Sequence, residues 1–192
     1  ARARLRHELG FEPDDVVFLT AARMHPQKRP LDLVELARRT VDLGRVSFLI
    51  VGGGELESSV DAAIAASGAR VRRLPFRSDI PDLIVAADVG CLVSDYEGLP
   101  VFLLECLQAG RPFLGTDVGD LGRVLTATGA GLVVETPGDL AALELAVRRL
   151  VDPATREELA ARARAASGRF SVEACAERYA EVWLGAGAGA TR

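Results

Sequence analysis

The chain has 192 residues, of which 49% are hydrophobic and 26% are charged, a balance typical of a globular domain with a substantial core. This composition excludes an intrinsically disordered chain, a fibrous repeat and a small disulfide-stapled scaffold. Lysine and arginine total 23 against 27 acidic residues, giving a net charge of −4. Because the nucleic-acid backbone is bound by basic surfaces, we expect no nucleic-acid partner.

Hydropathy and the cysteine residues indicate the cellular compartment in which the chain is expected to act. No apolar run approaches the roughly 18–20 residues that a membrane-spanning helix needs. Cys91, Cys106 and Cys175 lie far apart in apolar stretches and form no zinc-ligand spacing, so we expect buried free thiols in a reducing cytoplasm and no metal site. Since the first residue is Ala1, we also expect the chain to be part of a longer protein.

Short apolar runs alternate with amphipathic segments along most of the chain. Runs without polar alternation are typical of strands covered on both faces, and their alternation with helices indicates a parallel sheet. In chain order the pattern predicts strand 16–22, helix 31–43, strand 46–51, helix 55–67, strand 69–74, helix 80–87, strand 89–93, helix 99–109, strand 112–116 and strand 131–134. Helices 139–150, 153–166 and 172–184 follow, and then a flexible Ala/Gly-rich tail, 185–192. We therefore predict one α/β domain over 1–184, a Rossmann-like sheet of about six strands with helices on both faces.

Ligands of open parallel sheets bind at the carboxyl ends of the strands. The loop after the first strand carries Arg23, Lys28 and Arg29 ahead of a helix N-terminus, an arrangement that favours an anion. A solvated basic turn explains this loop equally well. No G-x-G-x-x-G fingerprint follows the first strand, which argues against a dehydrogenase.

Two further loops offer weaker signals. Gly53 and Gly54 belong to a glycine run after the second strand, where the backbone can approach a ligand closely or simply turn. Phe76 and Arg77 follow the third strand and provide a ring face and a cation. An ordinary capped turn beginning at Asp79 is an equally good explanation of that loop.

The loop after the fourth strand is the most informative. Glu97 precedes Gly98, Leu99 and Pro100, and Glu105 lies within an apolar helix, seven residues separating the two acids. A buried carboxylate without a partner costs several kcal/mol, so Glu105 is expected to serve a purpose. At about 1.5 Å of rise per residue, the acids should lie on the order of 10 Å apart, which suits two polar ends of one ligand. A purely structural role for both is the alternative.

These residues resemble the E-x7-E motif of retaining GT-B glycosyltransferases, in particular the family 4 type. The likeness extends along the chain through a G-R-x-x-x-x-K-like loop, a V-G-x-G-like turn, an A-D-v segment, a G-x-P-v-v-a-T-d-v-G-G-like stretch and an r-F-s segment, at 22–28, 51–54, 87–89, 110–119 and 169–171. The resemblance implies one half of a GT-B fold, the C-terminal domain that holds the donor. An N-terminal acceptor-binding domain would be absent from this chain and would allow peripheral membrane association of the full-length protein.

The resemblance also implies residue roles. Arg23 and Lys28 would bind the diphosphate of a nucleotide-diphosphate sugar, and Glu97 would contact the sugar hydroxyls. Glu105 would accept hydrogen bonds from the ribose, while Gly53, Gly54, Phe76 and Arg77 would border the donor. Backbone N–H groups at Gly98 and Leu99, before Pro100, would cradle phosphate. No metal or other cofactor is implied.

This sequence departs from the family pattern at two places. Arg29 stands where a glycine often follows the lysine, and the usual G-G-x-P-E segment reads Gly119-Asp120-Leu121-Gly122-Arg123. His25 matches no family role. Two alternatives to a glycosyltransferase stay open, a non-catalytic nucleotide-sugar-binding module and a GT-B-fold sugar-nucleotide epimerase. The nature of the product would distinguish the three.

Overall fold

The computed structural model describes residues 2–188, with side chains described as far as residue 185. Its centre is a sheet of six parallel strands in the order β3-β2-β1-β4-β5-β6. The strands are β1 (Val16–Ala21), β2 (Val46–Val51), β3 (Val71–Leu74), β4 (Val89–Leu92), β5 (Phe113–Thr116) and β6 (Gly131–Val134). The order reverses between β1 and β4, as in doubly wound sheets. The predicted fold class is confirmed.

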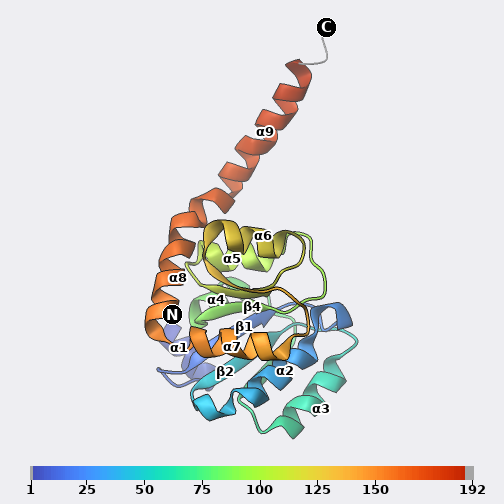
Figure 1. Ribbon diagram of the computed structural model, residues 1–192, viewed down its shortest axis with the longest axis vertical. Coiled ribbons are helices and arrows are strands. Elements are labelled where there is room, and N and C mark those ends of the chain that lie inside the picture. Colours follow the sequence, from blue (N-terminus) through green and yellow to red (C-terminus); the bar gives the residue numbers. More distant parts are fainter. Residues whose placement is uncertain (1, 189–192) are drawn as a thin grey trace.

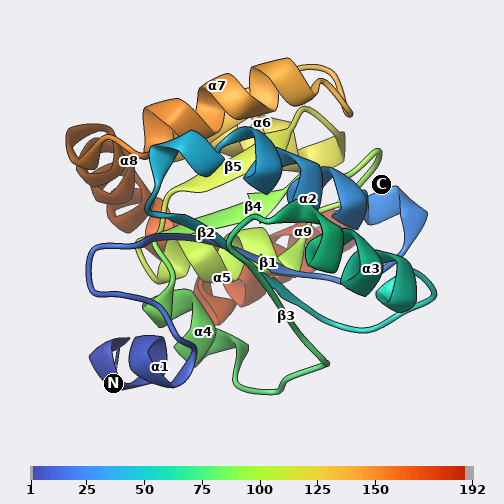
Figure 2. The same ribbon diagram turned by 90° about the horizontal axis from the view of Figure 1, so that it is seen from below.

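Helices cover both faces of the sheet (Figure 2). They are α1 (Arg2–Glu8), α2 (Pro30–Arg39), α3 (Glu57–Ser67), α4 (Ile80–Ala86), α5 (Val101–Gln108), α6 (Gly119–Thr128), α7 (Leu140–Leu150), α8 (Pro153–Ala166) and α9 (Val172–Ala188), with short 3-10 turns η1 (Pro26–Lys28), η2 (Val41–Leu43) and η3 (Ser167–Phe170). Helices α2, α3 and α7 pack on one face, whereas α4, α5 and α6 pack on the other, where α1 lies against α4. Phe18 and Phe48 stack at 5.1 Å between ring centroids in the first layer, and Phe102 meets Phe113 edge-on at 5.8 Å in the second.

Two helices were not predicted from the sequence. The only buried residue of α1 is Arg6, whose guanidinium donates to the carbonyl oxygens of Glu12, Asp15 and Ala86. A helix anchored by an arginine leaves no apolar periodicity to detect. Helix α6 carries two glycines, Gly119 and Gly122, in its first four residues, and these conceal its helical pattern because glycine is a weak helix former.

Three further predictions are corrected. Helix α5 begins at Val101 rather than at 99, because Pro100 has an extended conformation with ψ 122°. Helix α9 continues to Ala188, so the first four residues of the predicted tail are helical, and 189–192 lie outside the described residues. Cys175, on α9, is exposed, whereas Cys91 and Cys106 are buried as expected.

Helix α9 extends away from the rest of the domain (Figure 1). It follows η3, where the chain leaves α8. Several of its large apolar side chains are exposed, Trp183 at 76% among them. No helix within residues 2–188 is both long enough and apolar enough to cross a membrane.

Candidate functional site

The loops after β1 and β4 meet where the strand order reverses. Asp95 donates its backbone N–H to the carbonyl oxygen of Gln27 at 2.8 Å. The side-chain amide of Gln27 donates in turn to the carbonyl oxygen of Tyr96, also at 2.8 Å. The two loops therefore form one continuous surface at the carboxyl edge of the sheet, the place where ligands of such sheets bind.

Lys28 and Glu97 form an ion pair across this junction. Lys28 Nζ lies 2.6 Å from Glu97 Oε1, and the two side chains are 17% and 7% exposed. The hydroxyl of Ser94, a fully buried residue, donates to the same carboxylate oxygen at 2.6 Å. The structure thus brings together two residues that the sequence analysis assigned to different parts of a donor, and it adds Ser94, which that analysis did not single out.

The β1 loop is held in place by its own residues. Met24 is buried in the core, and His25 accepts a hydrogen bond from the N–H of Gln27 as the N-cap of η1. Arg29 adopts a left-handed conformation with φ 48° and forms ion pairs with Asp32 and Asp95. Hydrogen bonding to Asp32 and Asp95 raises the pKa of Arg29. These contacts fix the backbone on both sides of Lys28.

The glycine run after β2 lets the neighbouring loop pack against it. A Cβ atom at Gly52 would lie 2.0 Å from the carbonyl oxygen of Ala22, and one at Gly54 would lie 2.6 Å from that of Met24. Both glycines have φ values near 150° that side chains rarely adopt. Gly52 and Gly54 therefore serve loop packing, and Gly52 and Gly53 also line the adjoining pocket.

An open pocket of about 410 Å³ lies beside these loops. Its lining is mainly apolar and includes Gly53, Phe76 and Arg77, with Arg23 among its polar residues. Phe76 is 81% exposed, so its ring is available for stacking. Arg77 pairs with Asp79, and the resulting hydrogen bonds lower the pKa of that carboxyl. The Arg23 guanidinium has no hydrogen bond or ion pair to any residue among 2–188.

The approach to α5 presents backbone donors. Among the described residues, the N–H groups of Gly98 and Leu99 have no hydrogen-bond acceptor, and both residues precede the first turn of α5. The N-terminal residues of α6 contact the segment of Glu97 and Gly98. The N–H of Asp120 donates to the carbonyl oxygen of Gly98 at 3.1 Å, and a Cβ atom at Gly119 would lie only 1.9 Å from the carbonyl oxygen of Glu97.

Glu105 lies one turn into α5 and is partly buried. Burial raises the pKa of this carboxyl, and no hydrogen bond or ion pair joins it to another residue in the described chain. It does not line the pocket beside Phe76. Glu105 is thus a carboxylate whose acceptor capacity is unused within residues 2–188.

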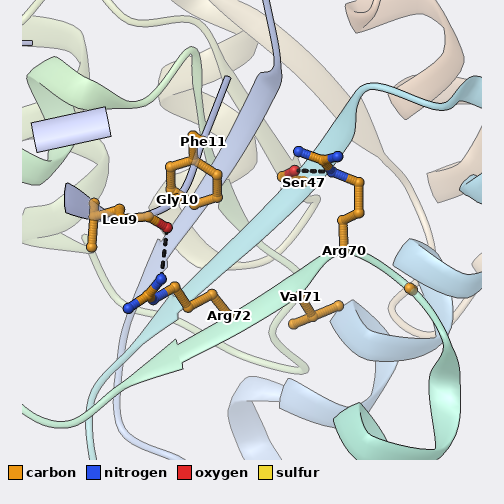
Figure 3. A pocket seen from close by; sticks show the side chains of 8 residues that line it. Leu9, Gly10, Phe11, Ser47, Arg70, Val71 and Arg72 are labelled. Carbon is orange, nitrogen blue, oxygen red and sulfur yellow. Dashed lines mark hydrogen bonds between the residues drawn. The ribbon is translucent and has the colours of Figure 1, made fainter. Parts of the chain in front are cut away.

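A second groove, of about 390 Å³, lies at the opposite, amino-terminal edge of β2 and β3. Figure 3 shows Arg70 donating to Ser47 and Arg72 donating to the carbonyl oxygen of Leu9. Arg70 also pairs with Asp15. Both guanidinium groups are thus engaged by the protein. Within residues 2–188, no group of three or more His, Cys, Asp and Glu side chains is arranged to hold a metal ion.

The chain is similar in sequence to known glycosyltransferases. The chain is 30% identical over 191 residues to the alpha-D-kanosaminyltransferase of Streptomyces kanamyceticus, which covers 95% of this chain and 48% of that protein. It is 32% identical over 202 residues to the D-inositol 3-phosphate glycosyltransferase of Streptosporangium roseum, with coverages of 97% and 46%. The chain therefore spans about half the length of these curated relatives.

Solved structures agree with this relationship. The Anabaena protein HepE in complex with UDP-glucose superposes with a TM-score of 0.86 at 25% identity, covering 95% of this chain and 52% of HepE. The family model described as "Glycosyl transferases group 1" matches residues 1–166. The chain accordingly belongs to the glycosyl transferases group 1 family.

Proposed function

We propose that this chain is the donor-binding half of a retaining, metal-independent glycosyltransferase of the family 4 type. It would hold a nucleotide-diphosphate sugar whose sugar is transferred to an acceptor. The observation that carries the proposal is the Lys28–Glu97 ion pair at the reversal of strand order, next to an open pocket that Arg23 borders. The UDP-glucose complex of HepE supports a nucleotide sugar as the ligand class.

The diphosphate would lie between Arg23, Lys28 and the start of α5. When the bond between the sugar and the phosphate oxygen breaks, its electron pair remains on the diphosphate, which gains negative charge. Fixed cations stabilise that charge in a partly desolvated site. The Arg23 guanidinium has no partner among the described residues, and the Lys28 ammonium has three donors, of which Glu97 engages one. The N–H groups of Gly98 and Leu99, together with the α5 dipole, add further positive potential.

Glu97 would bind the donor sugar through its second carboxylate oxygen. Lys28 and Ser94 both donate hydrogen bonds to Oε1, whereas Oε2 receives no hydrogen bond from any residue among 2–188. A sugar hydroxyl can donate to that free oxygen. Glu105 would accept hydrogen bonds from the ribose, which would use its free acceptors and stabilise the charge that burial disfavours.

The nucleobase would occupy the pocket beside Phe76. The exposed ring can stack on a heterocycle, and Arg77 can border it. Gly53 lines the same pocket and leaves room for close approach. The three loops after β1, β2 and β3 would thus contact the nucleotide together with the start of α5 and Glu105, while Glu97 in the loop after β4 would contact the sugar.

An N-terminal acceptor-binding half would complete the enzyme and act in the cytoplasm, and it would provide any peripheral membrane contact. Helix α9 supports this arrangement because Val172, Tyr179, Val182 and Trp183 are all at least 69% exposed. Spacings of seven, ten and eleven residues place these side chains along one stripe of a helix. We propose that this stripe packs on the acceptor half.

Calorimetric titration with UDP, GDP and ADP, each without divalent metal, tests the proposal. One nucleotide should bind selectively, and Arg23→Ala should weaken it about tenfold or more through loss of a charged contact. Arg45→Ala is the matched control, since Arg45 precedes β2 at the opposite edge and pairs with Asp14. A folded chain that binds none of the three, or equal losses in both variants, would contradict the proposal.

Product analysis distinguishes the proposed transferase from the other two classes of protein. The chain together with an acceptor half should release nucleoside diphosphate and a glycoside that retains the donor's anomeric configuration. Binding without turnover would indicate a non-catalytic module, and recovery of an altered sugar nucleotide would indicate an epimerase. On its own, the chain should bind the donor without appreciable transfer.

A further inference from the structure

We propose that Ser94 is a positioning residue that holds the Glu97 carboxylate toward the donor sugar. The inference rests on the proposed function, and it assigns a role to a side chain that would itself touch neither sugar nor phosphate. Ser94 acts through Glu97, because its hydroxyl donates to Glu97 Oε1 at 2.6 Å.

The place of Ser94 is fixed by the sheet. It lies two residues beyond the end of β4 and is fully buried. The hydroxyl of Thr116, the last residue of β5, donates to the Ser94 carbonyl oxygen at 2.7 Å, and Thr116 is fully buried as well. A short side chain on such a backbone has one rotatable bond to its hydroxyl. Its hydrogen bond therefore defines the position of Glu97 Oε1 tightly.

Lys28 cannot do this by itself once a donor is bound. Its ammonium shares Oε1 with Ser94, and the same ammonium would face the diphosphate. A lysine has a long flexible stem and moves with the charge that attracts it. Glu97, also a long side chain, would follow Lys28 toward the phosphates unless a second group held it. Within residues 2–188, Ser94 is the other group bonded to that carboxylate.

Loss of the Ser94 hydroxyl should therefore affect the sugar and not the diphosphate. Without it, Oε2 would no longer be kept in position for a sugar hydroxyl, whereas Arg23, Lys28 and the start of α5 would be unchanged. The relevant quantity is the ratio of the Kd for a nucleotide sugar to the Kd for its nucleoside diphosphate. A merely structural role for Ser94 would weaken both ligands and leave this ratio alone.

The experiment titrates wild type, Ser94→Ala, Glu97→Ala and the double variant with three pairs of ligands: UDP and UDP-glucose, GDP and GDP-mannose, and ADP and ADP-glucose. In Ser94→Ala the ratio should rise about tenfold, the scale of one hydrogen bond to a charged group. In the Glu97→Ala background, Ser94→Ala should not change the ratio further. The four proteins form a double-mutant cycle, which measures the coupling between Ser94 and Glu97. Thr20→Ala is the matched control, as its buried hydroxyl donates to the carbonyl oxygen of Cys91 at 2.7 Å, away from Glu97.

The outcomes separate the two proposals. If wild type binds no nucleotide or nucleotide sugar, the proposed function fails and the role of Ser94 fails with it. If wild type binds these ligands but Ser94→Ala weakens the binding of nucleotide sugar and nucleoside diphosphate equally, only the role of Ser94 is overturned. The same holds if Ser94→Ala raises the Kd ratio as much in the Glu97→Ala background as in wild type. Should Ser94→Ala not fold, Ser94→Cys keeps the side-chain size with a weaker donor. An unchanged ratio in that variant overturns the inference, and a raised ratio supports it.

Discussion

Replacing Lys28 by methionine leaves the Glu97 carboxylate, 7% exposed, with the Ser94 hydroxyl as its remaining described partner. Removing one member of a buried pair costs up to 3–5 kcal/mol, and partial solvent access reduces this to about 2–3 kcal/mol here. For a chain of this size, such a loss lowers Tm by roughly 4–12 °C. Glu97→Gln should cost less, about 1 kcal/mol or below, because the Lys28 stem can carry its ammonium to water.

The double variant Lys28→Met/Glu97→Gln removes both charges and should recover most of the stability lost in Lys28→Met. It should not recover nucleotide binding, because the cation that we propose for the diphosphate is still missing. Urea denaturation followed by circular dichroism gives the free energies of unfolding, and calorimetry gives the affinities. A Lys28→Met variant as stable as wild type, or a Glu97→Gln variant less stable than Lys28→Met, would contradict this role of the ion pair.

Three further substitutions test other parts of the site. Glu105→Gln should weaken nucleotide binding but stabilise the ligand-free fold. Burial raises the Glu105 pKa, so wild type loses stability as pH rises from the ordinary carboxyl value of about 4.3 through the raised value; equal Tm values for wild type and Glu105→Gln at pH 8 would contradict this. Arg29→Gly should be more stable than Arg29→Ala by about 1 kcal/mol because both lose the ion pairs but only alanine keeps the strain of φ 48°; thermal melts compare them. Gly119→Ala would place a Cβ 1.9 Å from the Glu97 carbonyl oxygen, whereas Gly44→Ala, also at positive φ, meets nothing within 4 Å. Gly119→Ala should therefore lower the free energy of unfolding, measured by urea denaturation, by at least about 2 kcal/mol more than Gly44→Ala. Similar losses in the two variants would argue against the close contact.

The sequence predicts the sheet well because most of its strands are largely apolar and buried, β3 with its two arginines being the exception. Five of the six predicted strands agree with the structure to within one residue at each end, and the third begins two residues late, at Val71. Burial on both faces dictates that composition, so a local pattern carries the information. Helices α1 and α6 could not be predicted in this way. The buried residue of α1 is an arginine, which is not part of an apolar pattern, and α6 contains two glycines, which are weak helix formers.

The candidate site likewise has a part that the sequence predicts and a part that it does not. Its loops could be predicted, because charged and glycine-rich segments follow the predicted strands. The pairing of Lys28 with Glu97 could not, because the two residues are 69 positions apart and meet only since β1 lies beside β4. The same holds for Ser94, whose role depends on which carboxylate lies beside it. Arg29 stands where a glycine often occurs, and its left-handed backbone now gives that departure a physical meaning.

A crystal structure of the chain with a bound nucleoside diphosphate tests the central claim most directly. We expect the two phosphates to lie between Arg23, the Lys28 ammonium and the N–H groups of Gly98 and Leu99, with the base over Phe76. A nucleotide bound instead in the groove at Arg70 and Arg72, at the amino-terminal edge of the sheet, would contradict it.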